Sequence, residues 1–326
     1  EFAIREWFER NLPVLKYHGT PIEELLEEQM REDFYHFEGN AQALRLVSKL
    51  HYLVDEHGMN LTYALLNTMI KYPVPSTGID KESGNIKDKK MGYYLADEEL
   101  FHRITKAGNN RHPLTYILEA ADDIAYKTAD IEDAFVKGFI SYHQLESELA
   151  VLEKETEDSP FKPATKLRKL YQRGVEKQVS SPEAYAVNWI ISVQGFVLNC
   201  VTYGFTSNYE AIMAGTFGQD LFYGTFAEKL MNLLGDLAYR KVFSSRQIYK
   251  MELAEYTILD FLMNRLVSSV LYYNTDSEQD SLDSRMVSFI SDNYKTAYRL
   301  QSQGKSRTEK LYLRLLLVTD YVCGMT

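Results

Sequence analysis

Three polar side chains at a regular helical spacing are the strongest candidates for chemistry in this sequence. Asp122, Tyr126 and Asp130 stand four residues apart in the stretch ILEAADDIAYKTADIEDAF, so a helix would place them on one face. Carboxylate oxygens are the ligands that Mg²⁺ and Mn²⁺ prefer. Several other acidic residues surround them and repel one another unless solvent or cations neutralise them. A solvated acidic face is therefore the alternative interpretation of this stretch.

A second candidate is the stretch HFEGNAQALRLVSKL, in which Glu38 and Asn40 flank Gly39 at a predicted helix start. The free N–H groups at such a start favour an anion. An ordinary capped helix is the alternative.

A third candidate is the predicted loop YPVPSTGIDKESGNIKDKKM, which is rich in proline, glycine and polar residues. Lys71 precedes it, and Lys90 is the last of three lysines near its end. Flexible ammonium groups can bind the oxygens of a triphosphate as point charges. Tyr93 and Tyr94 follow, and we expect them to be available for stacking on a base or sugar. A soluble surface loop is the alternative.

The elements that must position these residues are almost all predicted to be helical. Apolar residues recur every three or four positions from Phe37 to Gly58, including Val54, and Gly58 can end that helix. The stretches Ser181 to Tyr203 and Met251 to Tyr273 are apolar on most sides, which predicts buried helices. A short hairpin around residues 74–94 is the one predicted strand feature. The fold class is therefore predicted to be all-α.

The composition of the sequence limits the kinds of ligand, metal site and membrane contact that can be expected. Lys plus Arg is 36 and Asp plus Glu is 46, a net charge of −10, so a polyanionic ligand must meet a local basic patch or a metal ion. Cys200 and Cys323 form no CxxC pair, which excludes a thiolate zinc site and a disulfide framework. We find no apolar run of about 18 residues, so no membrane-spanning helix is predicted. No signal peptide opens the chain.

Several common catalytic motifs are absent from the sequence. It contains no Walker A run and no GxGxxG, GxSxG or HExxH motif, and none of its seven histidines is followed by Asp. The enzyme classes that depend on the first four of these motifs are therefore not predicted.

Taken together, several linked segments resemble the bacterial dGTP triphosphohydrolase family of the HD superfamily. The resemblance rests on FEGNAQALRLVSKL, KYP at Lys71, KKMGYYLADEE, HPLTYILEAADDIAYKTADIEDA and LRLLLVTDYVCGMT, which keep their order along nearly the whole chain. It implies an all-α HD fold in which residues 1 to about 145 belong to the catalytic core. Residues from about 146 to 326 would form a C-terminal helical part packed with it as one unit.

The resemblance also implies an activity and a site. The family hydrolyses dGTP to deoxyguanosine and tripolyphosphate at a divalent metal, expected here to be Mg²⁺ or Mn²⁺. Its metal ligands are an early His, an adjacent His-Asp pair and a distal Asp, which matches Asp122. Glu1 would match the catalytic glutamate, which works with a histidine three residues earlier. The expected substrate-binding residues are Asn40, Lys71, Lys90, Tyr126 and Asp130.

The chain departs from the family pattern because it contains no His-Asp pair. We expect that it is truncated at both ends and that this fragment alone is inactive. The alternatives are an HD phosphohydrolase acting on other dNTPs or nucleotides, and a non-catalytic helical module that binds nucleotides or single-stranded DNA. The resemblance further implies a cytoplasmic homo-oligomer, often a hexamer, with single-stranded DNA as a candidate regulatory partner and no membrane partner.

Overall fold

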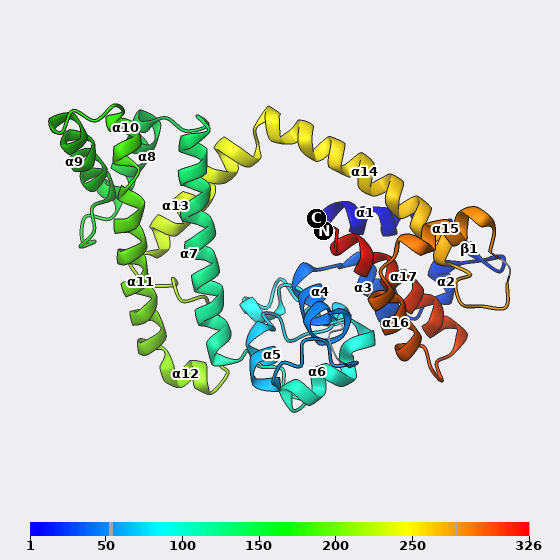
Figure 1. Ribbon diagram of the computed structural model, residues 1–326. Helices are drawn as coiled ribbons and strands as arrows, with labels where there is room; N and C mark the ends of the chain where they lie inside the picture. Colours follow the sequence, from blue (N-terminus) through cyan, green and yellow to red (C-terminus); the bar gives the residue numbers. More distant parts are fainter. Residues whose placement is uncertain (52–54, 278, 326) are drawn as a thin grey trace. The chain divides into compact units, whose positions relative to one another are not determined.

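The computed structural model describes residues 1–51, 55–277 and 279–325. Regular structure in these residues is helical, apart from one antiparallel pair of two-residue strands, β1 Lys16–Tyr17 and β2 Thr20–Pro21 (Figure 1). The predicted all-α fold is confirmed. The hairpin expected around residues 74–94 is wrong, because that segment forms short 3₁₀ turns instead.

The chain divides into two compact units. Unit 1 comprises Glu1–Thr115 and Leu253–Thr326, and unit 2 comprises Tyr116–Glu252. Unit 1 is thus built from two separate stretches of sequence. The boundary near residue 145, between the expected catalytic core and the C-terminal helical part, stays a prediction.

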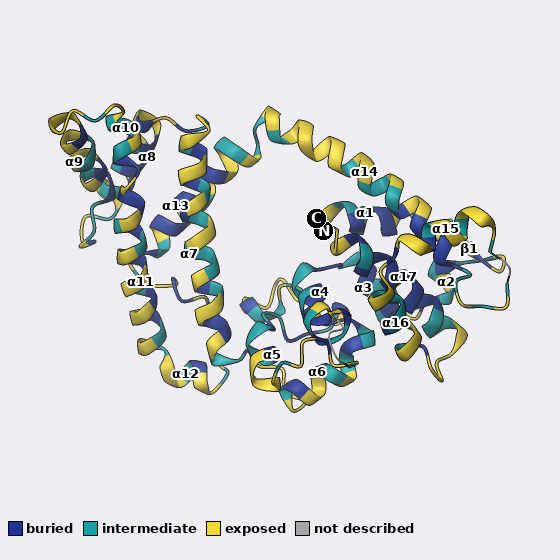
Figure 2. Ribbon diagram, viewed as in Figure 1, coloured by how far each residue is buried: buried dark blue, intermediate teal, exposed yellow. Residues whose placement is uncertain are grey.

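Unit 1 is a helical body around one central helix. Its elements are α1 Phe2–Asn11, α2 Ile22–Leu25, α3 Glu28–Tyr35, α4 Gly39–Arg45, the π-helical turn η1 Leu46–Leu50, α5 Tyr63–Met69, the 3₁₀ turns η2 Ser76–Gly78, η3 Ile86–Asp88 and η4 Leu95–Asp97, α6 Glu98–Thr105, α15 Ser281–Phe289, α16 Asp292–Gln301 and α17 Arg307–Cys323. Every residue of α17 from Leu311 to Asp320 is buried (Figure 2). A helix that is apolar on nearly all sides must lie inside the core.

Two long helices, α7 Pro113–Val136 and α14 Arg246–Val270, begin in one unit and end in the other. The remaining elements of unit 2 are α8 Tyr142–Glu155, α9 Pro163–Glu176, α10 Pro182–Ala186, α11 Trp189–Ser207, α12 Tyr209–Met213, α13 Glu228–Ala238 and η5 Tyr239–Phe243. Within unit 2, the Gln194 amide donates to the Thr128 hydroxyl at 2.9 Å, which joins α11 to α7. The face of α7 opposite this contact carries the predicted acidic site.

Three predicted helices differ in extent or burial. The stretch Ser181 to Tyr203, expected to be one buried helix, forms α10 and α11, and Ile191 and Leu198 are exposed. The helix expected over 37–58 is α4 followed by η1, which ends at Leu50, and Val54 lies outside the described residues. Most of α14 before Met263 is exposed or half-buried, so its expected burial holds only for its C-terminal part (Figure 2).

One helical stretch of the described residues, Pro182–Ser207, is long and apolar enough by composition to cross a membrane. Its most apolar window has a mean hydropathy of 1.4 and is 39% buried inside the protein. The core helix of a soluble protein passes the same test, so this single helix is weak evidence for a membrane span.

Candidate active site

Glu38 is the centre of a polar cluster in unit 1, at the residue preceding α4. Its side chain is 1% exposed and accepts hydrogen bonds from three residues. The Asn40 amide donates to Oε1 at 2.8 Å, and the Arg5 guanidinium donates to Oε2 at 3.1 Å. The Lys90 ammonium lies 3.1 Å from Oε1 and 3.0 Å from Oε2. The structure therefore brings together Asn40 and Lys90, two of the residues predicted to bind substrate.

Glu1 lies at the edge of the same cluster. Its Oε1 accepts a hydrogen bond from the Gly39 backbone N–H at 2.9 Å, and its Oε2 lies 3.4 Å from the Arg5 guanidinium. An added Cβ at Gly39 would lie 2.7 Å from Glu1 Oε1, so a larger residue there would displace this flexible carboxylate. The predicted catalytic carboxylate thus lies beside two of the predicted substrate-binding residues.

A pocket of about 380 Å³ opens on this cluster. Its lining residues are Arg5, His36, Glu38, Ile79, Lys81, Lys89 and Lys90. Four of these side chains carry a permanent positive charge and one is a carboxylate. A local excess of positive charge in an acidic protein suits a polyanion.

The sequence patterns do not identify every residue of this pocket. Arg5 of α1 belongs to none of the three candidate stretches, whereas His36, at the end of α3, and Lys81, in the loop between η2 and η3, lie within two of them but were not singled out. Two signals were visible in the sequence, namely the density of lysines in the loop and the carboxylate of Glu38 beside Asn40. The position of Arg5 depends on how α1 packs, so no local pattern predicts it.

Lys71 is placed differently from Lys90. It is half-buried, and its backbone carbonyl accepts a hydrogen bond from the Arg111 Nε at 2.9 Å. It does not belong to the described lining of the basic pocket. Its predicted role in substrate binding stays a prediction.

Asp122, Tyr126 and Asp130 all lie on α7 within unit 2. Tyr126 is 67% exposed, whereas Asp122 and Asp130 are half-buried. Partial burial, together with the charge of Asp133, raises the pKa of Asp130. The three residues share one helical face, as predicted. The roles of Asp122 in metal binding and of Tyr126 and Asp130 in substrate binding stay predictions.

The described residues do not form a metal site by themselves. No group of three or more His, Cys, Asp or Glu side chains in the described part of the chain lies close enough to hold a metal ion. Asp122 would supply one carboxylate ligand, whereas a bound divalent ion needs several. A metal at Asp122 therefore stays a prediction that rests on the family resemblance.

Tyr93 and Tyr94 are core residues, and the expectation that they stack on a base or sugar is wrong. Tyr93 is 4% exposed and stacks on Phe101 with ring centroids 3.9 Å apart, while Tyr94 is fully buried. The apolar core takes both rings because burial of aromatic area strongly stabilises the fold.

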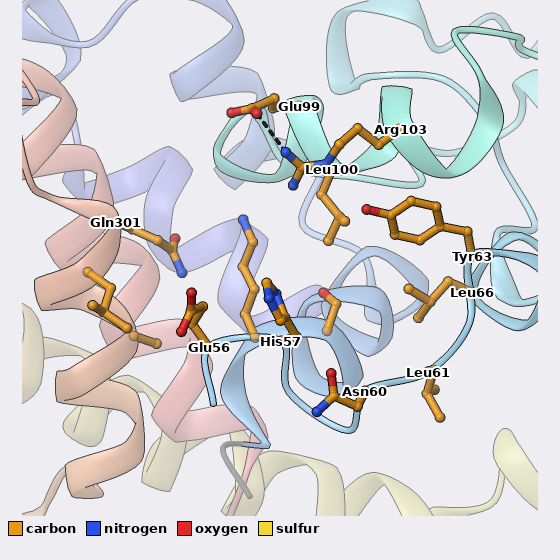
Figure 3. A pocket seen from close by; sticks show the side chains of 14 residues that line it. Glu56, His57, Asn60, Leu61, Tyr63, Leu66, Glu99, Leu100, Arg103 and Gln301 are labelled. Carbon is orange, nitrogen blue, oxygen red and sulfur yellow. Dashed lines mark hydrogen bonds and ion pairs between the residues drawn. The ribbon is translucent and has the colours of Figure 1, made fainter. Parts of the chain in front are cut away.

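A larger cleft of about 780 Å³ lies elsewhere in unit 1 (Figure 3). Its charges are mostly paired: Arg103 lies 2.7 Å from Glu99, and Lys49 lies 2.5 Å from Asp97. Leu61, Leu66 and Leu100 contribute apolar surface to it. Since this cleft has no excess of positive charge, the smaller basic pocket is the better site for a polyphosphate.

The fold and the basic pocket define an all-helical protein suited to hold a polyanion. Comparison with curated proteins gives 45% identity over 333 residues to a deoxyguanosinetriphosphate triphosphohydrolase-like protein of Listeria monocytogenes, covering all of this chain and 70% of that relative. A probable deoxyguanosinetriphosphate triphosphohydrolase of Pseudomonas aeruginosa is 34% identical over 285 residues, 81% of this chain and 56% of that protein. The deoxyguanosinetriphosphate triphosphohydrolase of Yersinia enterocolitica is 31% identical over 327 residues, 93% of this chain and 63% of that protein.

The chain belongs to the deoxyguanosinetriphosphate triphosphohydrolase family, a family of hydrolases. No family model matches the sequence.

Proposed function

We propose that the protein hydrolyses dGTP to deoxyguanosine and tripolyphosphate by attack of water at the α-phosphate. The observation that carries this proposal is the basic pocket beside Glu1, in which Arg5 and Lys90 share the buried carboxylate of Glu38. The names of its relatives support dGTP as the substrate.

The residues of unit 1 have distinct roles in this proposal. Lys90 and Arg5 bind the oxygens of the triphosphate, since preorganised cations stabilise developing charge without further reorganisation. Asn40 orients a phosphate oxygen or the sugar. Glu1 aligns the attacking water and takes up one of its protons. The new bond joins the water oxygen to the α-phosphorus, the bond from that phosphorus to the 5′ oxygen breaks, and the 5′ oxygen takes a proton to become the deoxyguanosine hydroxyl.

The family resemblance assigns further roles to residues of α7 and to Lys71. Tyr126 positions the phosphate or sugar ring, and Asp130 orients a sugar hydroxyl or a lysine. Lys71 is assigned to the β- and γ-phosphates. These assignments rest on the family resemblance and on the common face of α7.

A divalent ion, Mg²⁺ or Mn²⁺, is part of the proposal, with Asp122 as one ligand. Such an ion would polarise the α-phosphorus when bound. The chemistry of the Asp122 carboxylate suits either ion, although the described residues contain no group of three or more His, Cys, Asp or Glu side chains that could hold one.

The test is product analysis with a panel of nucleotides. The complete protein, supplied with Mg²⁺ or Mn²⁺, should release deoxyguanosine and tripolyphosphate from dGTP, with both products separated by chromatography. Equal turnover of all four dNTPs would favour the alternative of a general HD phosphohydrolase. Binding of dGTP without turnover would favour the non-catalytic module and contradict the proposal.

The assembly and surroundings of the protein are also proposals. The resemblance supports a cytoplasmic homo-oligomer, often a hexamer, and regulation by single-stranded DNA. Exposed apolar side chains on α11, including Ile191 at 68% and Leu198 at 60%, are compatible with a covered interface. Light scattering after size exclusion tests the assembly, and a titration with labelled single-stranded DNA at two salt concentrations tests that partner.

A further inference from the structure

Glu38 is a buried carboxylate whose partners all belong to the basic pocket or its edge. A buried charge is costly unless it is paired and hydrogen-bonded. At 1% exposure, Glu38 meets that requirement by accepting from Arg5, Asn40 and Lys90. Both of its oxygens are used.

The cations that it holds remain accessible to a ligand. The Lys90 side chain is 43% exposed and the Arg5 side chain is 31% exposed. An ammonium has three donors and a guanidinium has five, so each cation keeps donors that can face the pocket. Glu38 therefore holds two cations from the buried side. Arg5 is also held by the Phe37 carbonyl, which its Nε contacts at 2.6 Å, and by Glu1, and the remaining donors of both cations can face an anion.

Capping of α4 does not explain the carboxylate. Glu38 occupies the position before the first residue of α4, yet its side chain makes no capping hydrogen bond to that helix. The Gly39 N–H is bound by Glu1 instead. Thus the interactions of the Glu38 carboxylate are with the pocket side chains.

Charge arithmetic supports the same role. Arg5, Lys81, Lys89 and Lys90 carry four positive charges against the two carboxylates of Glu38 and Glu1, which leaves a net charge of about +2. Without Glu38, two neighbouring cations would repel each other and move toward solvent. Their spacing would then no longer be fixed before the ligand arrives.

We propose that Glu38 is a positioning residue that presets Lys90, Arg5 and Asn40 for the polyphosphate part of the substrate. This inference rests on the proposed function and adds a residue to it. In this proposal Glu38, which is 1% exposed, acts on the substrate through the cations that it holds.

The test uses inorganic tripolyphosphate as the probe, with its binding to the full chain measured by calorimetry. Glu38→Gln has one acceptor oxygen, and its amide N–H₂ would face a cation. Because hydrogen bonds to charged groups are worth about 1.5–3 kcal/mol, we expect binding to weaken at least about tenfold. KM for dGTP should rise more than kcat falls. Glu38→Asp, which keeps the charge, should recover part of the loss.

A double-mutant cycle separates positioning from a general structural effect. In a Lys90→Met background, Glu38→Gln should weaken tripolyphosphate binding less than in the wild type, because one of the cations that it positions is gone. Glu99→Gln is the matched control, since that carboxylate is 88% exposed and pairs with Arg103 at the other cleft. It should change neither binding nor KM.

Distinct outcomes overturn the two proposals. If the wild type releases tripolyphosphate from dGTP and Glu38→Gln binds the probe as tightly as the wild type, the role of Glu38 is wrong. The same holds if the effects of Glu38→Gln and Lys90→Met simply add. If the wild type releases no tripolyphosphate, the proposed function itself is wrong. Should Glu38→Gln fail to fold, Glu38→Asp binding the probe like the wild type would also overturn the role, because a shortened carboxylate cannot keep all three contacts.

Discussion

At the scale of single residues, the site depends on side chains whose charges are held close together in space. Lys90 and Arg5 both approach Glu38, and Glu1 approaches Arg5. The sequence predicted Glu1, Asn40 and Lys90 through the family resemblance. It did not predict Glu38 as the shared partner of Arg5, Asn40 and Lys90. These contacts arise only when α1, α4 and the loop of residues 72–91 pack together.

Lys90→Met should weaken substrate binding. The substitution removes a half-exposed ammonium from the pocket while keeping an apolar stem, so we expect KM for dGTP to rise about tenfold. Steady-state kinetics at low and high salt should show a smaller salt dependence than in the wild type. Lys154→Met, at an exposed position of α8, is the control, and an equal effect there would refute a specific role for Lys90.

Gly39→Ala should displace the carboxylate of Glu1. The added Cβ would lie 2.7 Å from Glu1 Oε1, and that flexible side chain can move away. Since general acid–base groups contribute about 10²–10⁴-fold to rate, kcat should fall at least about tenfold while the melting temperature changes little. Gly195→Ala serves as the control, because its Cβ would meet nothing within 4 Å. Unchanged kcat in Gly39→Ala would argue against Glu1 as the catalytic carboxylate.

At the scale of elements, buried charges join the helix that follows the site to the central helix. Arg45 at the end of α4 binds Asp320 of α17 through two hydrogen bonds, Nε to Oδ1 at 2.7 Å and the second nitrogen to Oδ2 at 2.8 Å. Both side chains are almost fully buried. This pair fixes α4 against the core and so sets the position of the residues before it.

Asp320→Ala should therefore destabilise unit 1 strongly. Removal of one partner leaves Arg45 buried with a weaker set of acceptors, and breaking such a pair costs about 3–5 kcal/mol. Chemical denaturation measures the loss. The double change Arg45→Met with Asp320→Leu should recover much of it, and a single-variant loss below about 1 kcal/mol would contradict this account.

Asp33 makes the stability of unit 1 depend on pH. The carboxylate joins α3 to Tyr312 of α17, the Ser76 hydroxyl and the Leu95 N–H. Burial raises its pKa to about 7, against the opposing effect of these hydrogen bonds. The folded state therefore holds the proton more tightly than the unfolded state, whose pKa is about 3.9. The stabilisation from this group is complete below about pH 4 and is lost as pH rises through about 7.

The free energy of unfolding should accordingly carry a contribution from Asp33 that falls by up to about 4 kcal/mol between pH 4 and 7. Chemical denaturation of the wild type and of Asp33→Asn across this pH range measures the contribution of Asp33, because the variant has no carboxyl at that position. Parallel pH profiles for the two proteins would show that Asp33 does not titrate in this way.

At the scale of the whole molecule, periodicity predicted element types better than their grouping. The acidic helix is α7, as expected from its pattern, whereas the segment that forms α17 was identified only through the family resemblance. The composition of unit 1 from two distant stretches was not predictable, since no local signal marks where α7 and α14 pass from one unit to the other. Tyr93 and Tyr94 show a further limit of prediction from sequence. An aromatic side chain beside lysines suits a binding site and an apolar core equally well, so the sequence does not distinguish the two.

The metal assignment is a prediction for the complete protein. Chelation with EDTA should abolish dGTP hydrolysis, and added Mn²⁺ or Mg²⁺ should restore it. Asp122→Ala should reduce kcat by at least about 10³-fold with the helical circular dichroism spectrum unchanged, because a divalent ion contributes several kcal/mol to charge stabilisation. Glu132→Ala, at an exposed position of the same helix, is the control. Near-normal turnover by Asp122→Ala would reject Asp122 as a ligand.

The central claim is that water attacks the α-phosphate of dGTP. Hydrolysis in ¹⁸O-labelled water, followed by mass spectrometry of the products, tests it most directly. The account predicts one labelled oxygen in the tripolyphosphate and none in the deoxyguanosine. Label in orthophosphate, in dGMP or in the deoxyguanosine hydroxyl would contradict it.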